Sequence, residues 1–188
     1  MNVDEKLALF TLLGQGAART VRSLKETAPP ESLWLSPTYD LGPLLPEAVR
    51  EAIDASEAYR LFFVFETYLR ELVVDVLSKD PAVNWYDKVP DNVKTDVAAL
   101  EETEEVKAWM GLGSRDRSAL MTYPQLLSVI DSNWKGAFDD VVRDKALIQA
   151  ARTLSHLRNT ICHMSTIPAD EIERVRRTMR DWFRMVAP

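Results

Sequence analysis

The chain has 188 residues, of which 46% are hydrophobic and 28% charged, and its formal net charge is −6. This length is typical of one globular domain with an appended element, and the apolar content argues against a disordered chain. The single cysteine, Cys162, excludes a disulfide scaffold and a multi-cysteine zinc site, which favours a reducing, cytoplasmic location. The longest apolar run, Leu61–Phe65, is far shorter than the roughly 20 residues of a membrane-spanning helix, so we expect no membrane partner.

Charge is distributed unevenly along the chain. Residues 1–140 carry 14 basic and 24 acidic side chains, whereas residues 141–188 carry nine basic and five acidic ones. The excess of positive charge near the C-terminus points to a local site for an anionic partner.

Helical periodicity dominates the first part of the chain. A first helix is predicted over residues 3–26, softened near Gly14 and Gly16, and a connection with five prolines follows over residues 28–46. Residues 46–79 then predict a long helix with Pro46 at its first position. No Asn-Gly or Asp-Gly hairpin turn occurs, so we expect no strand.

The remaining pattern is helical as well. An acidic helical stretch ends at the Gly111–Gly113 break, and one helix or two short ones follow over residues 123–142. Two more helices are predicted over residues 143–164 and 169–186. The expected fold is an all-α bundle of five or six helices, in which residues 1–45 form an N-terminal helix and connection and residues 46–188 form the helical domain.

Charged residues interrupt two apolar helix faces. Glu66 lies in the middle of the apolar arc of the long helix, and Arg70 lies near its edge. The arc consists of Phe62, Phe63, Phe65, Leu69, Leu72, Val73, Val76 and Leu77. Arg158 lies on the core stripe of a later helix. Because an unpaired buried carboxylate costs several kcal/mol, we expect the Glu66 carboxylate to pair with Arg158. The alternative is an ion pair, with Arg158 or within the helix with Arg70, that only fixes helix register.

The segment Arg158–His163 holds the densest chemistry, with one of only two histidines. His163 lies about 140° around the helix from Arg158, so the two converge only at a helix end, across a groove or from two copies of the chain. The plain alternatives are a capping His163, an Asn159 that caps backbone groups, and a Cys162 that is a small, partly buried thiol. His156 falls opposite the core stripe and is expected to be exposed.

Arg158–His163 resembles the Arg-polar-x(3)-His signature of the HEPN superfamily. The run Phe65–Leu72 resembles the family's earlier helix, in which a Glu precedes a Leu-Arg pair. Three shorter segments resemble the Swt1-like branch of the superfamily: Trp85-Tyr86, Tyr123–Leu127 and Asn133-Trp134. The resemblance covers residues 46–188, and residues 1–45 match no family pattern.

The resemblance implies a helical homodimer that brings two motifs together in one cleft. Many members are metal-independent endoribonucleases, often toxins or antiviral effectors, which adds RNA and a protein regulator or antitoxin as partners. No metal or other cofactor is implied. His163 would transfer the proton, Arg158 would stabilise the phosphate charge, Asn159 would orient either of them, and Glu66 with Arg70 would support Arg158.

The last predicted helix is amphipathic. Its polar side carries a basic strip formed by Arg176, Arg177, Arg180 and Arg184. A solvated positive face is one interpretation, and guidance of an RNA backbone toward the cleft is the other.

Two function hypotheses therefore remain. The first is a metal-independent HEPN endoribonuclease that leaves 2′,3′-cyclic phosphate and 5′-hydroxyl ends. The second is a non-catalytic HEPN dimer that binds RNA, a nucleotide or a protein. The complete Arg158, Asn159 and His163 set favours the first, whereas the acidic bulk of the chain favours the second.

Overall fold

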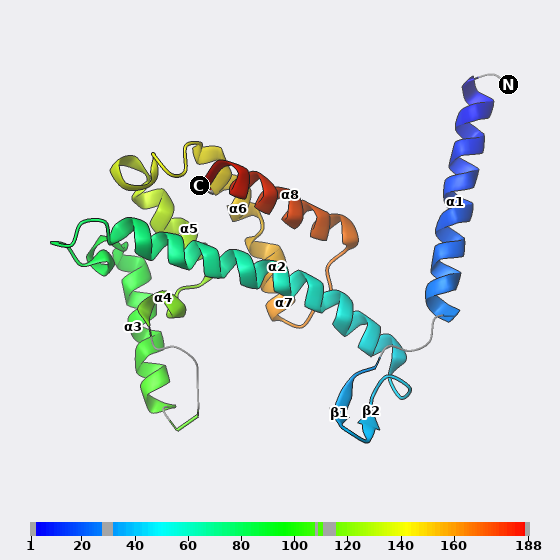
Figure 1. The fold of residues 1–188 in the computed structure, drawn as a ribbon, viewed down its shortest axis with the longest axis horizontal. Helices are drawn as coiled ribbons and strands as arrows, with labels where there is room; N and C mark the ends of the chain where they lie inside the picture. The colour runs from blue at the N-terminus through cyan, green and yellow to red at the C-terminus, as the bar shows by residue number, and fades with distance from the viewer. Residues whose placement is uncertain (1–2, 28–31, 108, 111–115, 187–188) are drawn as a thin grey trace. The chain divides into compact units, whose positions relative to one another are not determined.

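The structure is a computed structural model that describes residues 3–27, 32–107, 109–110 and 116–186. Contacts divide the chain into two compact units, Met1–Ala52 and Ile53–Pro188, while the expected boundary at residues 45/46 stays a prediction. The all-α expectation is confirmed: the described residues form eight α-helices and one small two-stranded sheet (Figure 1). None of these helices is both long enough and apolar enough to cross a membrane.

The first helix, α1 (Val3–Thr27), is continuous through Gly14 and Gly16, where softening was expected. Each glycine costs only about 1 kcal/mol relative to alanine, and strong helix formers (Leu, Gln, Ala and Arg) surround both positions. Its apolar side chains, including Leu7 and Phe10, are exposed to solvent.

A short hairpin follows in the same unit, so the expectation of no strand is wrong at this point. Strands β1 (Trp34–Ser36) and β2 (Tyr39–Asp40) pair antiparallel. The Asp40 carboxylate accepts hydrogen bonds from the backbone N–H groups of Leu33 at 2.8 Å and Gly42 at 2.9 Å. The hydrogen bond from Gly42 is the main cause of a lowered pKa for Asp40, and the bond from Leu33 adds to it. Together they outweigh desolvation, which would raise this pKa.

The second unit is built around the long helix α2 (Pro46–Leu77), whose residues from 53 onward belong to it. Phe65, Leu69 and Val73 on α2 are completely buried. The Phe65 ring packs against Trp182 of α8 (Ala169–Val186) and Tyr123 of α5 (Tyr123–Ser132), with centroids 5.6 and 5.9 Å apart. These contacts hold α5 and α8 against α2, and Figure 1 shows α8 beside the middle of α2.

Short elements connect these helices. A 3-10 turn (Trp85–Lys88) leads to α3 (Asp91–Val106), and α4 (Arg117–Leu120) precedes α5. The predicted break at Gly111–Gly113 lies outside the described residues. After α5, the turn Trp134–Phe138 depends on Gly136, whose φ of 91° is readily adopted only by glycine.

The expected helix over residues 143–164 is divided in two. Helix α6 (Lys145–Thr153) ends at Leu154, whose N–H bonds back three residues to Ala151, and α7 (Ser155–Cys162) starts directly afterwards. This division and the four-residue α4 explain why the described residues form eight helices where five or six were expected. Leu154 and Ile161 are buried, and they anchor α7 in the core.

Candidate functional site

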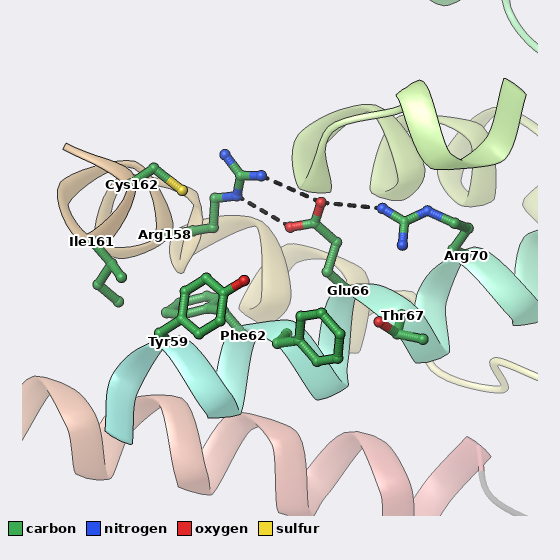
Figure 2. A pocket seen from close by; sticks show the side chains of 9 residues that line it. Tyr59, Phe62, Glu66, Thr67, Arg70, Arg158, Ile161 and Cys162 are labelled. Carbon is green, nitrogen blue, oxygen red and sulfur yellow. Dashed lines mark hydrogen bonds and ion pairs between the residues drawn. The ribbon is translucent and has the colours of Figure 1, made fainter. Parts of the chain in front are cut away.

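The carboxylate of Glu66 on α2 lies between two guanidinium groups (Figure 2). Arg158 of α7 donates from Nε to Oε2 at 3.1 Å and from Nη2 to Oε1 at 3.3 Å. Arg70, one turn further along α2, donates from Nη2 to Oε1 at 3.4 Å. The predicted pair of Glu66 with Arg158 is confirmed, and the pair with Arg70 forms at the same time.

Arg158 is held in its charged form, and Glu66 uses only some of the hydrogen-bond donors of its guanidinium group. Burial alone would lower the pKa of Arg158, but the hydrogen bonds and charge of Glu66, with a smaller effect from Cys162, raise it above its ordinary value. The bonds to Glu66 use Nε and Nη2, so Nη1 donates to neither oxygen of that carboxylate. Permanent charge and a nitrogen that the carboxylate does not engage are the features with which arginine binds phosphate oxygens.

Arg70 ties the same carboxylate to a second part of the fold. Its Nε donates to the backbone carbonyl of Ser118 on α4 at 2.7 Å. Tyr123 lies close enough to Glu66 for the carboxylate charge to act on its hydroxyl, which donates to the carbonyl of Ala151 at 2.8 Å. Burial is the main cause of a strongly raised pKa for Tyr123, and the negative charge of Glu66 adds to it.

An open pocket of about 160 Å³ borders this charge cluster. It is lined by residues of α2 and α7: Tyr59, Phe62, Phe63, Glu66, Thr67, Arg70, Arg158, Ile161 and Cys162. Phe63 was expected in the buried arc, yet it is 59% exposed, and Tyr59 one turn earlier is 55% exposed. Both lie toward the charged side of α2, beyond the part of the arc that α5 and α8 cover. Their i, i+4 spacing was the sequence signal that could have revealed this pair.

His163 and Asn159 lie outside the lining of the pocket. His163 is the exposed residue that ends α7, and Asn159 is exposed one turn earlier. In the described part of the chain, neither side chain makes a hydrogen bond, so the expected alternative of a capping Asn159 side chain is not observed, whereas His163 is the C-cap residue of α7 through its backbone. The Asn159 backbone carbonyl accepts the N–H of His163 at 3.0 Å, which fixes the main chain at the end of the helix.

The position of His163 depends on a tight helix end. Met164 has a φ of 57°, its N–H bonds to the Ile161 carbonyl at 3.0 Å, and the N–H of Ser165 bonds to Thr160 at 3.1 Å. This is a Schellman motif, and glycine is its usual residue at the left-handed position. Met164 occupies that position although its side chain is 94% exposed.

Replacing Met164 with glycine tests this strain. We expect Met164→Gly to stabilise the fold by about 0.5–1 kcal/mol, because glycine adopts a positive φ without a Cβ clash and an exposed side chain loses no packing. Urea denaturation measures the change. Met185→Gly, at a half-exposed methionine in the last turn of α8, replaces a residue with helical backbone and should give no such gain in stability. Destabilisation of equal size in both variants would contradict the left-handed geometry at Met164.

The predicted basic strip on α8 is only partly unpaired. Arg176 forms ion pairs with Glu57 of α2 and Glu173 of α8. Arg177, Arg180 and Arg184 are exposed, and within the described residues they have no ion-pair partner. Helix α8 contacts the side of α2 that carries Phe65 and Tyr68, whereas the pocket opens on the side that carries Glu66 and Arg70. The structure therefore does not bring the strip and the pocket together within one copy of the chain.

The remaining residues with reactive side chains are Cys162 and His156, and both are exposed. Cys162 is an exposed free thiol beside Arg158, where a partly buried one was expected, and His156 is exposed as expected. Among the described residues, no group of three or more His, Cys, Asp or Glu side chains could hold a metal ion.

Comparison with known proteins identifies the family. The model of the Swt1-like HEPN family matches residues 60–187, which is more than half of the chain and contains both Glu66 and the Arg158–His163 segment. The chain therefore belongs to the Swt1-like HEPN family. No curated protein and no solved structure matches it.

Proposed function

We propose that this protein is a metal-independent HEPN endoribonuclease that uses the 2′-hydroxyl of its RNA substrate as the nucleophile. Membership in the Swt1-like HEPN family suggests an RNA-related, nuclease-type function. The observation that carries the finer proposal is the arrangement at α7, where a charged Arg158 lines an open pocket and an exposed His163 ends the same helix.

Arg158 is the residue that binds the scissile phosphate. Charge builds up on the non-bridging oxygens as the 2′-oxygen attacks phosphorus, and a fixed cation stabilises that charge more than the starting phosphodiester. Glu66 is a positioning residue, because its two hydrogen bonds fix the plane of the Arg158 guanidinium. Arg70 in turn holds Glu66, and its bond to Ser118 keeps this support attached to α4.

His163 is the proton-transfer residue. As a base it accepts the 2′-hydroxyl proton while the 2′-oxygen bonds to phosphorus, and as an acid it protonates the 5′-oxygen that leaves. The products are a 2′,3′-cyclic phosphate and a 5′-hydroxyl, and Asn159 orients the imidazole or the phosphate. Because His163 lies outside the pocket that Arg158 lines, we infer that a homodimer combines Arg158 of one copy with His163 of the other.

A second candidate function is a non-catalytic HEPN dimer that binds RNA, a nucleotide or a protein. The observation that favours it is the engagement of Arg158 by Glu66, which neutralises part of the charge of Arg158.

The biological role that we propose applies to the endoribonuclease. It would act as a toxin or an antiviral effector in the cytoplasm, and a protein regulator or antitoxin would keep it inactive.

Cleavage of a mixed RNA pool in EDTA distinguishes the two functions. The full chain should cut the pool, leave cyclic-phosphate ends, and lose this activity in the His163→Ala variant. Absence of cutting by the wild-type chain, at protein concentrations that bind RNA, would favour the binding module.

The unpaired part of the basic strip gives a separate prediction about RNA affinity. If Arg177 and Arg180 contact phosphates, the Arg177→Gln/Arg180→Gln variant should flatten the slope of log affinity against log salt by about 1.4, since each contact to a single strand contributes about 0.7. The control variant, Arg174→Gln/Arg176→Gln, changes net charge equally but removes arginines paired with Glu171, Glu57 and Glu173. Fluorescence anisotropy over a salt series measures both slopes, and equal slopes would show that the strip is only a solvated face.

A further inference from the structure

Two aromatic rings face solvent at the mouth of the pocket. Tyr59 and Phe63 lie one turn apart on α2, with ring centroids 6.0 Å apart and ring planes inclined by 32°. Both line the pocket, and both are more than half exposed. The next aromatic residues on the same helix, Phe62 and Phe65, are buried. The core of this unit is therefore filled without the Tyr59–Phe63 pair, which leaves two ring faces available to a ligand.

The same pocket is charged along its other wall. The Arg158 guanidinium lines it, and Nη1 of that group is not used by Glu66. A nucleotide carries a flat aromatic base and an anionic phosphate that are linked covalently, so one nucleotide can use the rings and the cation together. Aromatic side chains beside arginines are the usual means by which proteins bind unpaired bases.

We propose that Tyr59 and Phe63 form a stacking platform for an unpaired base of an RNA strand whose neighbouring phosphate is bound by Arg158. The identity of the strand as RNA rests on the proposed function, while the stacking itself rests on the geometry of the rings. The platform makes the site selective for single-stranded segments, because a base within a duplex cannot lay its face on a protein ring.

The homodimer proposed above brings a second copy close to Arg158, but the two ring faces fit the body of that copy less well than they fit a base. Charged residues are depleted from the centre of protein–protein interfaces, and here Arg158, Glu66 and Arg70 lie in the same pocket as the rings. The rings also border a concavity, which suits a flat ligand that enters edge first.

Binding of a single-stranded 2′-O-methyl oligonucleotide that contains 2-aminopurine tests the proposal on the full chain. The methyl group blocks the attacking oxygen, so binding is measured without cleavage, and stacking on a ring quenches the fluorescence of 2-aminopurine. We expect Tyr59→Leu and Phe63→Leu each to weaken binding roughly 5- to 150-fold and to relieve the quenching, since a stacked base contributes about 1–3 kcal/mol. Tyr59→Phe and Phe63→Tyr keep the rings and should bind as the wild type does.

Two controls separate stacking from other effects. Val64→Leu alters an exposed apolar residue of α2 that does not line the pocket, and it should leave affinity unchanged. An oligonucleotide with abasic sites should bind the wild type weakly and should be insensitive to Phe63→Leu. Equal binding of abasic and intact strands would overturn the platform, as would failure of the wild type to bind the probe.

The remaining arms identify the occupant of the platform. Light scattering that shows a dimer in the wild type but a monomer in Phe63→Leu would assign the rings to a contact between copies and overturn the proposal. Adenosine monophosphate that binds as tightly as the oligonucleotide would assign the pocket to free nucleotides instead. Ring-dependent quenching without any RNA cleavage would leave the platform supported and the nuclease refuted, so the two proposals fail separately.

Discussion

The His163→Ala variant is expected to lower the rate of metal-free RNA cleavage by roughly 10²- to 10⁴-fold, the usual contribution of one proton-transfer group. The fold should be unaffected, because the imidazole is exposed at the end of α7 and has no hydrogen-bond partner in the described part of the chain. The Schellman motif that ends α7 uses only backbone groups of residues 160–165, and it survives the substitution. Gel analysis of an end-labelled RNA in EDTA measures the rate.

The second histidine of the chain provides a matched control. His156 is also exposed and also lies on α7, and within the described residues its side chain makes no hydrogen bond, while its backbone carbonyl accepts the hydroxyl of Thr160 at 2.9 Å. His156→Ala should therefore retain the wild-type rate and melt at the same temperature. Equal cleavage rates for the wild type and His163→Ala would show that the observed activity does not come from this motif.

Periodicity was sufficient to predict the centre of the site. Glu66 and Arg158 interrupt two apolar helix faces with opposite charges, and the cost of burying either alone indicated that they meet. The structure joins them across 92 residues of sequence. The apolar face of α8 could be predicted in the same way, because Ile172 and Trp182 recur at helical spacing, and both are buried in the structure.

Other features depend on interactions that a periodic pattern does not encode. The hairpin at residues 34–40 is held by the Asp40 side chain, which bonds to backbone groups on both sides of the turn. Phe63 has the same hydrophobicity as its buried neighbours, and its exposure follows only from where α5 and α8 cover α2. The placement of His163 depends on Met164 in a left-handed conformation that sequence patterns assign to glycine.

The Glu66→Ala variant should cause the largest loss of stability among the charged residues of the site. It leaves Arg158 without its two hydrogen bonds to Glu66, and within the described residues it leaves Arg70 with the bond to Ser118 alone. Removing one partner of a fully buried pair costs about 3–5 kcal/mol. Because the Glu66 and Arg158 side chains are 14% and 24% exposed, water reaches the remaining charges, and we expect a loss of about 2–3 kcal/mol in the free energy of unfolding.

A double-mutant cycle shows whether this loss comes from the pair itself. The Glu66→Ala/Arg158→Ala variant removes both charges, so it should be more stable than the sum of the two single changes predicts, by about 1–2 kcal/mol. The pair of Lys94 with Asp91, within one turn of α3, has a fully exposed carboxylate and should show a coupling below about 0.5 kcal/mol in the same assay. Additive effects at Glu66 and Arg158 would mean that the two side chains do not stabilise each other in solution. Glu66 could then not be the residue that orients Arg158 toward a phosphate.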